Sequence, residues 1–274
     1  MPTEVITRIT SLFSSCKAEG RKAFIAYITG GDPTPSQTVS LVLALERGGA
    51  DLVELGVPFS DPIADGPVIQ RASERALRAK STVAGLLETV REIRRQSQIP
   101  LLLFSYLNPL LRYGFEKLAG DAVEAGIDGV LLTDLCIEEA AESVHQLRKR
   151  GLDTIFLAAP TSTDRRLRLV SEHSSGFIYL VSRSGVTGEQ ASVSDSAAPI
   201  VTRMRAITDL PLAMGFGIGT PQQVAEVARL TDGVVVGSAI VKFIEENAAS
   251  SDLPARLEEW TRRLSAPLRL PVNL

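Results

Sequence analysis

The sequence predicts an α/β fold, a (β/α)8 TIM barrel with an extra N-terminal helix, in a single domain over residues 1–274. Short β-branched or aliphatic runs alternate with helical stretches, and this alternation predicts a parallel sheet. Eight such units in about 250 residues match the closed eight-stranded barrel better than an open doubly wound sheet. No GxGxxG motif follows the first strand, which weakens the dinucleotide-binding alternative. No Pro/Ser-rich linker or change of composition divides the chain.

The elements follow one another in a regular order. Strands are predicted at 24–29, 52–57, 101–107, 129–134, 154–159, 177–182, 212–217 and 233–236. Helices are predicted at 35–47, 68–79 with 83–96, 115–125, 138–149, 164–172, 197–208, 221–229 and 253–264. Glycines just past the ends of several of these segments are typical helix stop signals. A leading helix near 5–17 is expected to cover the bottom of the barrel.

Composition narrows the class of protein. The chain is 45% hydrophobic and 22% charged, which is typical of a globular protein in water. Its net charge of -3 disfavours bulk attraction to nucleic acid or to an anionic membrane. No apolar run approaches the roughly 20 residues that span a bilayer, and the N-terminus lacks the pattern of a signal peptide. Two cysteines fit a reducing compartment, so we expect a cytoplasmic protein.

A carboxylate interrupts the second apolar strand. Side chains alternate between the two faces of a strand, so Val53, Leu55 and Val57 share one face and Glu54 points to the other. If the aliphatic face meets helices, Glu54 projects into the barrel, where desolvation raises the pKa of a carboxyl group. Asp65 follows in a loop rich in Pro and Gly. Two acids in different environments are a common acid–base pair; the alternative is a solvated strand-end Glu and an Asp that only shapes a turn.

The same alternation applies to two tyrosines. Ile178 and Leu180 are expected to face helices, which turns Tyr179 inward, and Tyr27 and Thr29 are expected to share that orientation on the first strand. Tyr179 can equally be a core aromatic residue whose hydroxyl bonds to backbone.

A phosphate site is predicted at the loops after the last strands. TIM barrels often bind phosphate with the loops after strands seven and eight and a helix N-terminus. Gly217 and Gly237 allow backbone N–H groups to approach an anion, and Ser238 is expected to cap the following helix. The loop 184–188 can add a third edge. Two loops, 59–67 and 183–197, exceed the usual length and lie at the carboxyl side, where barrel enzymes build active sites.

Other chemistries have little support. His145 and His173 fall on exterior helix faces, and no Cys/His/Asp cluster has the spacing of a metal site. Ser60 and Ser182 lack a histidine partner for nucleophilic catalysis. Cys136 is expected to be a small packed residue. No lysine lies centrally in a strand, which disfavours Schiff-base chemistry.

Several motifs together resemble the tryptophan synthase alpha chain family. They occur in the family's order, at 30–33, 52–67, 179–188, 215–218 and 237–241. The resemblance implies a (β/α)8 lyase that cleaves indole-3-glycerol phosphate to indole and glyceraldehyde 3-phosphate. It also implies an α2β2 complex with a beta chain that uses PLP to join indole to serine, and no cofactor in this chain.

The resemblance implies roles for individual residues. Glu54 and Asp65 match the two catalytic carboxylates: Glu54 suits proton delivery to indole C3, and Asp65 suits stabilisation of the indole N–H as it gains positive charge. Tyr179 matches the family tyrosine near the substrate. The implied substrate-binding residues are Tyr27, Thr187, Gly188, Phe216, Gly217, Gly237 and Ser238.

The two long loops are implied to be mobile. The loop 59–67, together with Pro58, Asn108 and Asp134, is expected to contact the beta chain, and 183–197 is expected to act as a lid through Thr187. Cys136 stands where many relatives have proline. Two other interpretations are a different phosphate-binding barrel enzyme, which gives no reason for the acid pair, and a catalytically silent barrel that only docks on a beta chain.

Overall fold

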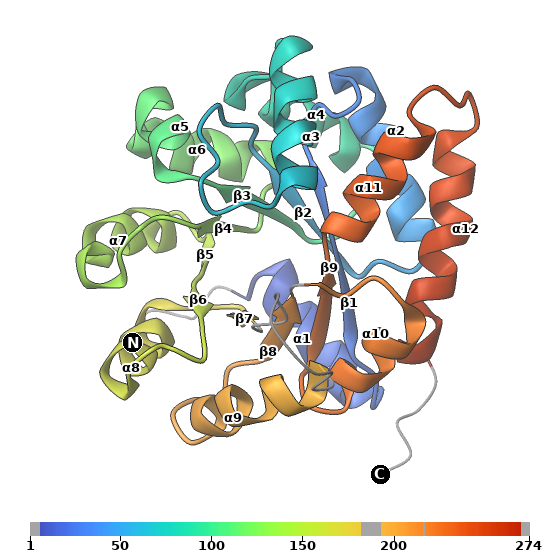
Figure 1. Ribbon diagram of the computed structural model, residues 1–274. Coiled ribbons are helices and arrows are strands. Elements are labelled where there is room, and N and C mark those ends of the chain that lie inside the picture. The colour runs from blue at the N-terminus through green and yellow to red at the C-terminus, as the bar shows by residue number, and fades with distance from the viewer. Residues whose placement is uncertain (1–5, 182–192, 216, 270–274) are drawn as a thin grey trace.

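The computed structural model describes residues 6–181, 193–215 and 217–269, and their strands form a barrel surrounded by helices (Figure 1). The described strands are all parallel and follow the order β5-β4-β3-β2-β1-β9-β8-β7-β6. Their bounds are Ala23–Thr29 (β1), Leu52–Gly56 (β2), Leu101–Ser105 (β3), Gly129–Leu132 (β4), Asp153–Ile155 (β5), Leu157–Ala158 (β6), Ile178–Val181 (β7), Leu212–Gly215 (β8) and Gly233–Val236 (β9). Only Phe156 separates β5 from β6, so the two ends of the sheet belong to one interrupted strand. The predicted eight-stranded barrel is confirmed.

Helices follow the strands and cover the outside of the barrel. Their bounds are Arg8–Ala18 (α1), Pro35–Arg47 (α2), Pro67–Arg78 (α3), Val83–Arg94 (α4), Leu107–Tyr113 (α5), Phe115–Ala125 (α6), Ala141–Lys149 (α7), Asp164–His173 (α8), Val193–Arg205 (α9), Pro221–Ala228 (α10), Ser238–Asn247 (α11) and Leu253–Ser265 (α12), with short 3-10 turns at Ile137–Glu139 (η1) and Ala266–Leu268 (η2). Among the described residues, no helix combines the length and the apolar character needed to cross a membrane.

Most predicted elements lie within a few residues of the observed ones, and two differ more. The strand predicted at 101–107 ends at Ser105, because Leu107 begins the short helix α5 that the sequence analysis missed. Pro109 is tolerated there because backbone N–H groups in the first turn of a helix have no intrahelical partner. Helix α9 begins at Val193, so the loop after β7 is shorter than the predicted 183–197.

The two faces of each strand pack differently. Residues such as Val53 and Leu55 pack outward against the helices in one continuous cluster, as the alternation predicts. Leu52 faces the barrel interior, in a second cluster that α1 closes from below with Ile9 and Phe13. Burying each such side chain contributes roughly 1.5–3 kcal/mol. The predicted covering helix is therefore confirmed, and we call the opposite end of the barrel the mouth.

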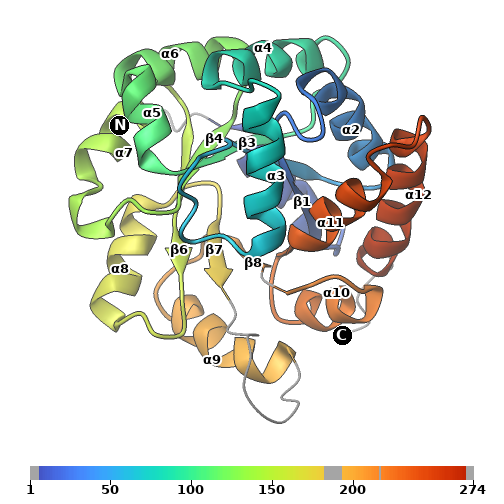
Figure 2. The same cartoon turned by 45° about the horizontal axis from the view of Figure 1, so that its top comes forward.

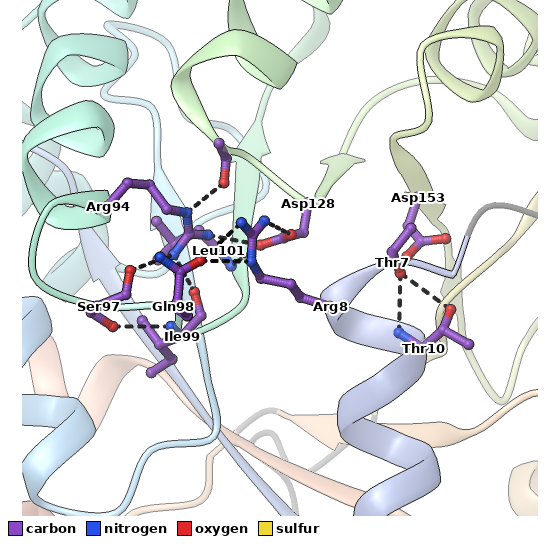
Figure 3. Close-up of polar contacts among 11 residues, drawn as sticks. Thr7, Arg8, Thr10, Arg94, Ser97, Gln98, Ile99, Leu101, Asp128 and Asp153 are labelled. Atoms are coloured by element: carbon purple, nitrogen blue, oxygen red, sulfur yellow. Dashed lines mark hydrogen bonds and ion pairs between the residues drawn. The ribbon is translucent and has the colours of Figure 1, made fainter.

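Ion pairs anchor α1 to the bottom of the barrel (Figure 3). Asp128, just before β4, accepts Nη1 of Arg8 and Nη2 of Arg94, both at 2.8 Å, and the backbone N–H of Leu101 at 2.8 Å. Thr7, the N-cap of α1, donates its hydroxyl to Asp153. The Asp128 side chain is only 4% exposed, so these hydrogen bonds offset the cost of burying a polar group.

Replacing Asp128 by alanine is expected to lower the free energy of unfolding by about 3 kcal/mol, because it leaves the nearly buried Arg94 guanidinium without its counter-ion. Arg8→Ala is the matched control. Its side chain is 42% exposed, so the loss should be below about 1 kcal/mol. Urea unfolding of both variants measures the difference, and equal losses would contradict this account of the anchor.

Candidate active site

Glu54 lies inside the barrel near its mouth. It is the third residue of β2, in register with Tyr27 of β1, and only 1% of its surface is exposed. Neither carboxylate oxygen has a hydrogen-bond partner among the described residues. Desolvation raises the pKa of Glu54 to about 8, so the carboxyl group is mainly protonated at neutral pH. The alternative of a solvated strand-end glutamate is therefore wrong.

Two tyrosines share this interior. Tyr27 and Tyr179 are both buried, and desolvation raises the pKa of each. The charge of Asp65 adds to the rise for Tyr27, and the charge of Glu54 adds to it for Tyr179. Each ring lies against a glycine at a strand end. A Cβ atom on Gly56 would lie 2.2 Å from the Tyr27 hydroxyl oxygen, and one on Gly215 would lie 2.2 Å from that of Tyr179. Because glycine has no Cβ atom, the two tyrosine hydroxyls fit beside these strand ends, on the side of the mouth.

Asp65 is held in the loop between β2 and α3. Its carboxylate accepts the Tyr106 hydroxyl at 3.1 Å, and the same hydroxyl oxygen accepts the backbone N–H of Ala64 at 2.9 Å. Gln70 donates to the backbone oxygen of Asp65 at 2.8 Å. Partial burial raises the pKa of Asp65, and the Tyr106 hydrogen bond opposes that rise.

Tyr106 is not among the residues predicted for the site. It follows β3 directly and ends up in the mouth, and its ring packs against Phe59 with the centroids 5.2 Å apart. Its place immediately after a barrel strand was the available signal, because side chains at the carboxyl ends of barrel strands meet at the mouth.

The predicted phosphate site is only partly described. Gly217 has a φ of 72°, a left-handed conformation that glycine adopts without steric cost. Gly237, and not Ser238, is the N-cap of α11, so the prediction that Ser238 caps this helix is wrong; Ser238 is its first residue and is exposed. Glycine can take the irregular backbone conformation found at this cap. The first turn of α11 carries no acid that would compete with an anion. Thr187, Gly188 and Phe216 lie outside the described residues, as does most of the predicted lid.

The three predicted interface residues lie on loops or short helices after β2, β3 and β4. Pro58 is buried, Asn108 is exposed on α5, and Asp134 is exposed and accepts the backbone N–H that begins α5 at 2.7 Å. Cys136 is exposed, so the prediction that it packs inside is wrong. It lies between β4 and η1, where the chain runs over the surface, and its thiol donates to Glu138 at 2.9 Å.

The mouth thus combines a buried neutral acid, a second acid held by a tyrosine, and a helix N-terminus free of acidic residues. A protonated carboxyl can deliver a proton, an ionised one can stabilise a developing cation, and a helix N-terminus favours an anion. Within the described ranges, no three His, Cys, Asp or Glu side chains gather so as to hold a metal ion.

Comparisons with known proteins identify the family of this chain. The sequence profile of the tryptophan synthase alpha chain family matches residues 13–266. The chain is 61% identical over 259 residues to the tryptophan synthase alpha chain of Solibacter usitatus (strain Ellin6076), covering 94% of this chain and 97% of that one. It is 51% identical over 241 residues to that of Geobacter sp. (strain M21), covering 88% and 90%.

Solved structures give the same result. Tryptophan synthase subunit alpha from Legionella pneumophila str. Paris superposes with a TM-score of 0.89 at 39% identity, covering 96% of this chain and 98% of that chain. A chain of the tryptophan synthase of M. tuberculosis gives 0.87 at 37% identity, with coverage of 96% and 99%. On the profile match, the identities and the shared barrel, this chain belongs to the tryptophan synthase alpha chain family.

Proposed function

We propose that Glu54 and Asp65, with Tyr179 beside them, carry out the reaction of this chain, the retro-aldol cleavage of indole-3-glycerol phosphate to indole and glyceraldehyde 3-phosphate. The chain is a carbon–carbon lyase of L-tryptophan biosynthesis. The observation that carries the proposal is Glu54, a carboxyl group 1% exposed, without a hydrogen-bond partner among the described residues, and with its pKa raised to about 8. A buried acid of this kind is suited to proton transfer at neutral pH.

The reaction needs two proton transfers. A proton delivered to indole C3 makes that carbon tetrahedral, so that the ring can leave. A proton is also removed from the hydroxyl on the carbon bonded to indole C3, which becomes the aldehyde carbon as the bond breaks. Protonated Glu54 supplies the first proton. The carboxylate that this transfer leaves is a base in the same buried position, so it can accept the hydroxyl proton and return to its starting state. No net proton is consumed.

Asp65 stabilises the charge that protonation of C3 creates. The indole nitrogen becomes positive in that step, and an ionised carboxylate beside its N–H lowers the energy of the intermediate. Tyr106 keeps Asp65 in place and favours its ionised form. The two acids therefore work in opposite protonation states, which their different environments support.

The phosphate of the substrate binds at the start of α11. The first backbone N–H groups of α11 have no intrahelical partner, and together with the hydroxyl of Ser238 they can donate hydrogen bonds to an anion at this helix end. Gly188, Gly217 and Phe216 complete the phosphate site in the proposal, Tyr27 lines the substrate cavity, and Thr187 belongs to a lid that closes over it.

The proposed partner is a PLP-dependent beta chain in an α2β2 complex, to which this chain passes indole; this chain itself uses no cofactor. The exposed apolar residues near the mouth support a docking surface. Ile63 in the loop after β2 is 87% exposed and Leu111 on α5 is 55% exposed, and both lie close in sequence to the predicted contacts Pro58 and Asn108. We assign Asp134 to the same docking surface. The complex is expected to function in the cytoplasm.

Incubating the purified chain with indole-3-glycerol phosphate tests the proposal, with and without a tryptophan synthase beta chain. We expect equal amounts of indole and glyceraldehyde 3-phosphate, formed faster when the beta chain is present. Absence of both products even with the beta chain would contradict the catalytic role and favour a silent docking barrel.

A further inference from the structure

Four charged side chains join three elements beside the mouth. Arg75 of α3 binds both carboxylate oxygens of Asp32, Nε to Oδ1 at 2.7 Å and Nη2 to Oδ2 at 2.9 Å. The remaining Nη1 of Arg75 binds Glu245 of α11 at 2.6 Å. Arg71, one turn earlier on α3, binds Glu245 with two nitrogens, both at 2.8 Å. Arg75 is thus the one residue of the four that contacts both the loop after β1 and α11.

Each joined element leads directly into the proposed site. Helix α3 begins two residues after Asp65, and α11 begins at Ser238. Arg75 is eight positions beyond the start of α3, or about 12 Å along the helix axis. The two helices lie side by side in both views (Figure 1, Figure 2). The ion pair between Arg75 and Glu245 therefore restricts the relative positions of the first turns of α3 and α11.

A second contact between the same helices lies nearer their first residues. Ala72 of α3, Val241 of α11 and Tyr27 of β1 form a small buried cluster, with Val68 and Ile69 packed on it. One apolar contact permits the helices to pivot about it. Farther along both helices, Arg71 and Arg75 both bind Glu245 and supply a second point. Arg75 also binds Asp32, so it fixes this second point to the loop after β1.

We propose that Arg75 is a positioning residue for the cleavage reaction: by clamping Asp32 and Glu245 together it sets the distance between Asp65 and the phosphate-binding start of α11. This rests on the proposed function, which places the indole end of the substrate at Asp65 and the phosphate end at Ser238. The planar fork of arginine fits a carboxylate with two parallel hydrogen bonds, which the single ammonium of lysine cannot form. Asp32 is only 2% exposed, so the clamp sits on a fixed point of the barrel.

The variant Arg75→Lys tests the clamp, because it keeps the charge next to the buried Asp32 and loses the fork. Arg78→Lys is the matched control: Arg78 lies on the same helix, is 77% exposed and, among the described residues, forms an ion pair only with Glu74. Arg71→Lys isolates the contribution of Glu245, because Arg71 contacts Glu245 without reaching Asp32. Thermal unfolding and far-UV circular dichroism establish that each variant is folded at the assay temperature.

Two ligands separate positioning from simple loss of structure. Glycerol 3-phosphate reports only the phosphate end, while 3-(indol-3-yl)propyl phosphate, which lacks the hydroxyls needed for cleavage, spans both ends. For Arg75→Lys we expect kcat for indole release and affinity for the two-ended ligand to fall about tenfold. Affinity for glycerol 3-phosphate should be unchanged. Arg78→Lys should match the wild type in all three measurements.

Equal weakening of both ligands, or unchanged kcat in Arg75→Lys, would overturn the inference. If Arg75→Lys does not fold, Glu245→Gln serves in its place, because Glu245 is partly exposed and glutamine keeps the shape of the side chain while losing the charge; the same split between the ligands is expected. Asp65→Asn distinguishes the two proposals. Full activity of Asp65→Asn contradicts the proposed function, whereas full activity of Arg75→Lys beside an inactive Asp65→Asn contradicts only the clamp.

Discussion

Glu54→Gln is expected to lower kcat for indole release by about 10³-fold, because the amide retains the shape of the side chain but has no proton acidic enough to deliver to indole C3. Its substrate affinity should change little, since the proposed phosphate contacts lie on loops after other strands and at the start of α11, and not on β2. Steady-state assays of indole release give both parameters. Glu74→Gln, on the exposed face of α3, is the control and should be fully active.

The variant Glu54→Gln should be more stable than the wild type at alkaline pH. Burial raises the pKa of Glu54 from 4.5 to about 8, so the folded protein holds a proton that the unfolded chain releases between these values. The stability linked to this group is fully present below pH 4.5 and is lost as pH rises toward 8. Glutamine does not titrate, so Glu54→Gln does not lose stability in this way. A pKa shift of this size corresponds to at most about 5 kcal/mol of unfolding free energy.

Urea unfolding at pH 5 and pH 9 measures this difference, and the gain in stability of Glu54→Gln over the wild type should be much larger at pH 9. A gain that is the same at both pH values would mean that Glu54 is not the buried acid described here. Unchanged kcat in the variant would rule out Glu54 as the proton donor, whatever its effect on stability.

Asp65→Asn is expected to lower kcat by about 10²-fold, because the neutral amide cannot balance the positive charge that develops on the indole nitrogen. Asp61→Asn is a closely matched control. It lies in the same loop and is exposed, and its carboxylate accepts the Ser60 hydroxyl, so the activity of Asp61→Asn without the beta chain should equal that of the wild type.

The pH dependence of Asp65→Asn gives a second readout. Asp65 acts when ionised, so wild-type activity should rise with pH through its pKa, which burial places above the ordinary value. In Asp65→Asn this rise of activity with pH should be absent. If Asp61→Asn and Asp65→Asn lose activity equally, the loop as a whole matters and Asp65 has no special role.

Much of the barrel is readable from local patterns. A strand has a period of two, so the aliphatic neighbours Val53 and Leu55 were enough to turn Glu54 inward, without knowledge of any other strand. The helix α2 was predicted with its observed bounds because Pro35 begins it and Gly48 follows it. Where a local pattern was ambiguous the prediction failed, as with α5, whose Leu-Asn-Pro start extends an apolar run.

The chemistry at the mouth depends on contacts that local patterns do not contain. Tyr106 reaches Asp65 from 41 positions away, and Arg75 joins Asp32 and Glu245, which lie 43 and 170 positions from it. The order of the strands and the packing of the helices bring these groups together, and no periodicity in the chain specifies which side chains then meet.

The sequence by itself determined the repeated strand–helix units, the inward direction of Glu54 and the motifs of the family, because each depends on residues close together in the chain. The tertiary structure alone decided that Glu54 has no partner among the described residues, that Tyr106 holds Asp65, and that Arg75 connects α3 with α11. The physical reason is that desolvation and ion pairing depend on every group that surrounds an atom in space, and in a closed barrel most of those groups come from distant parts of the chain.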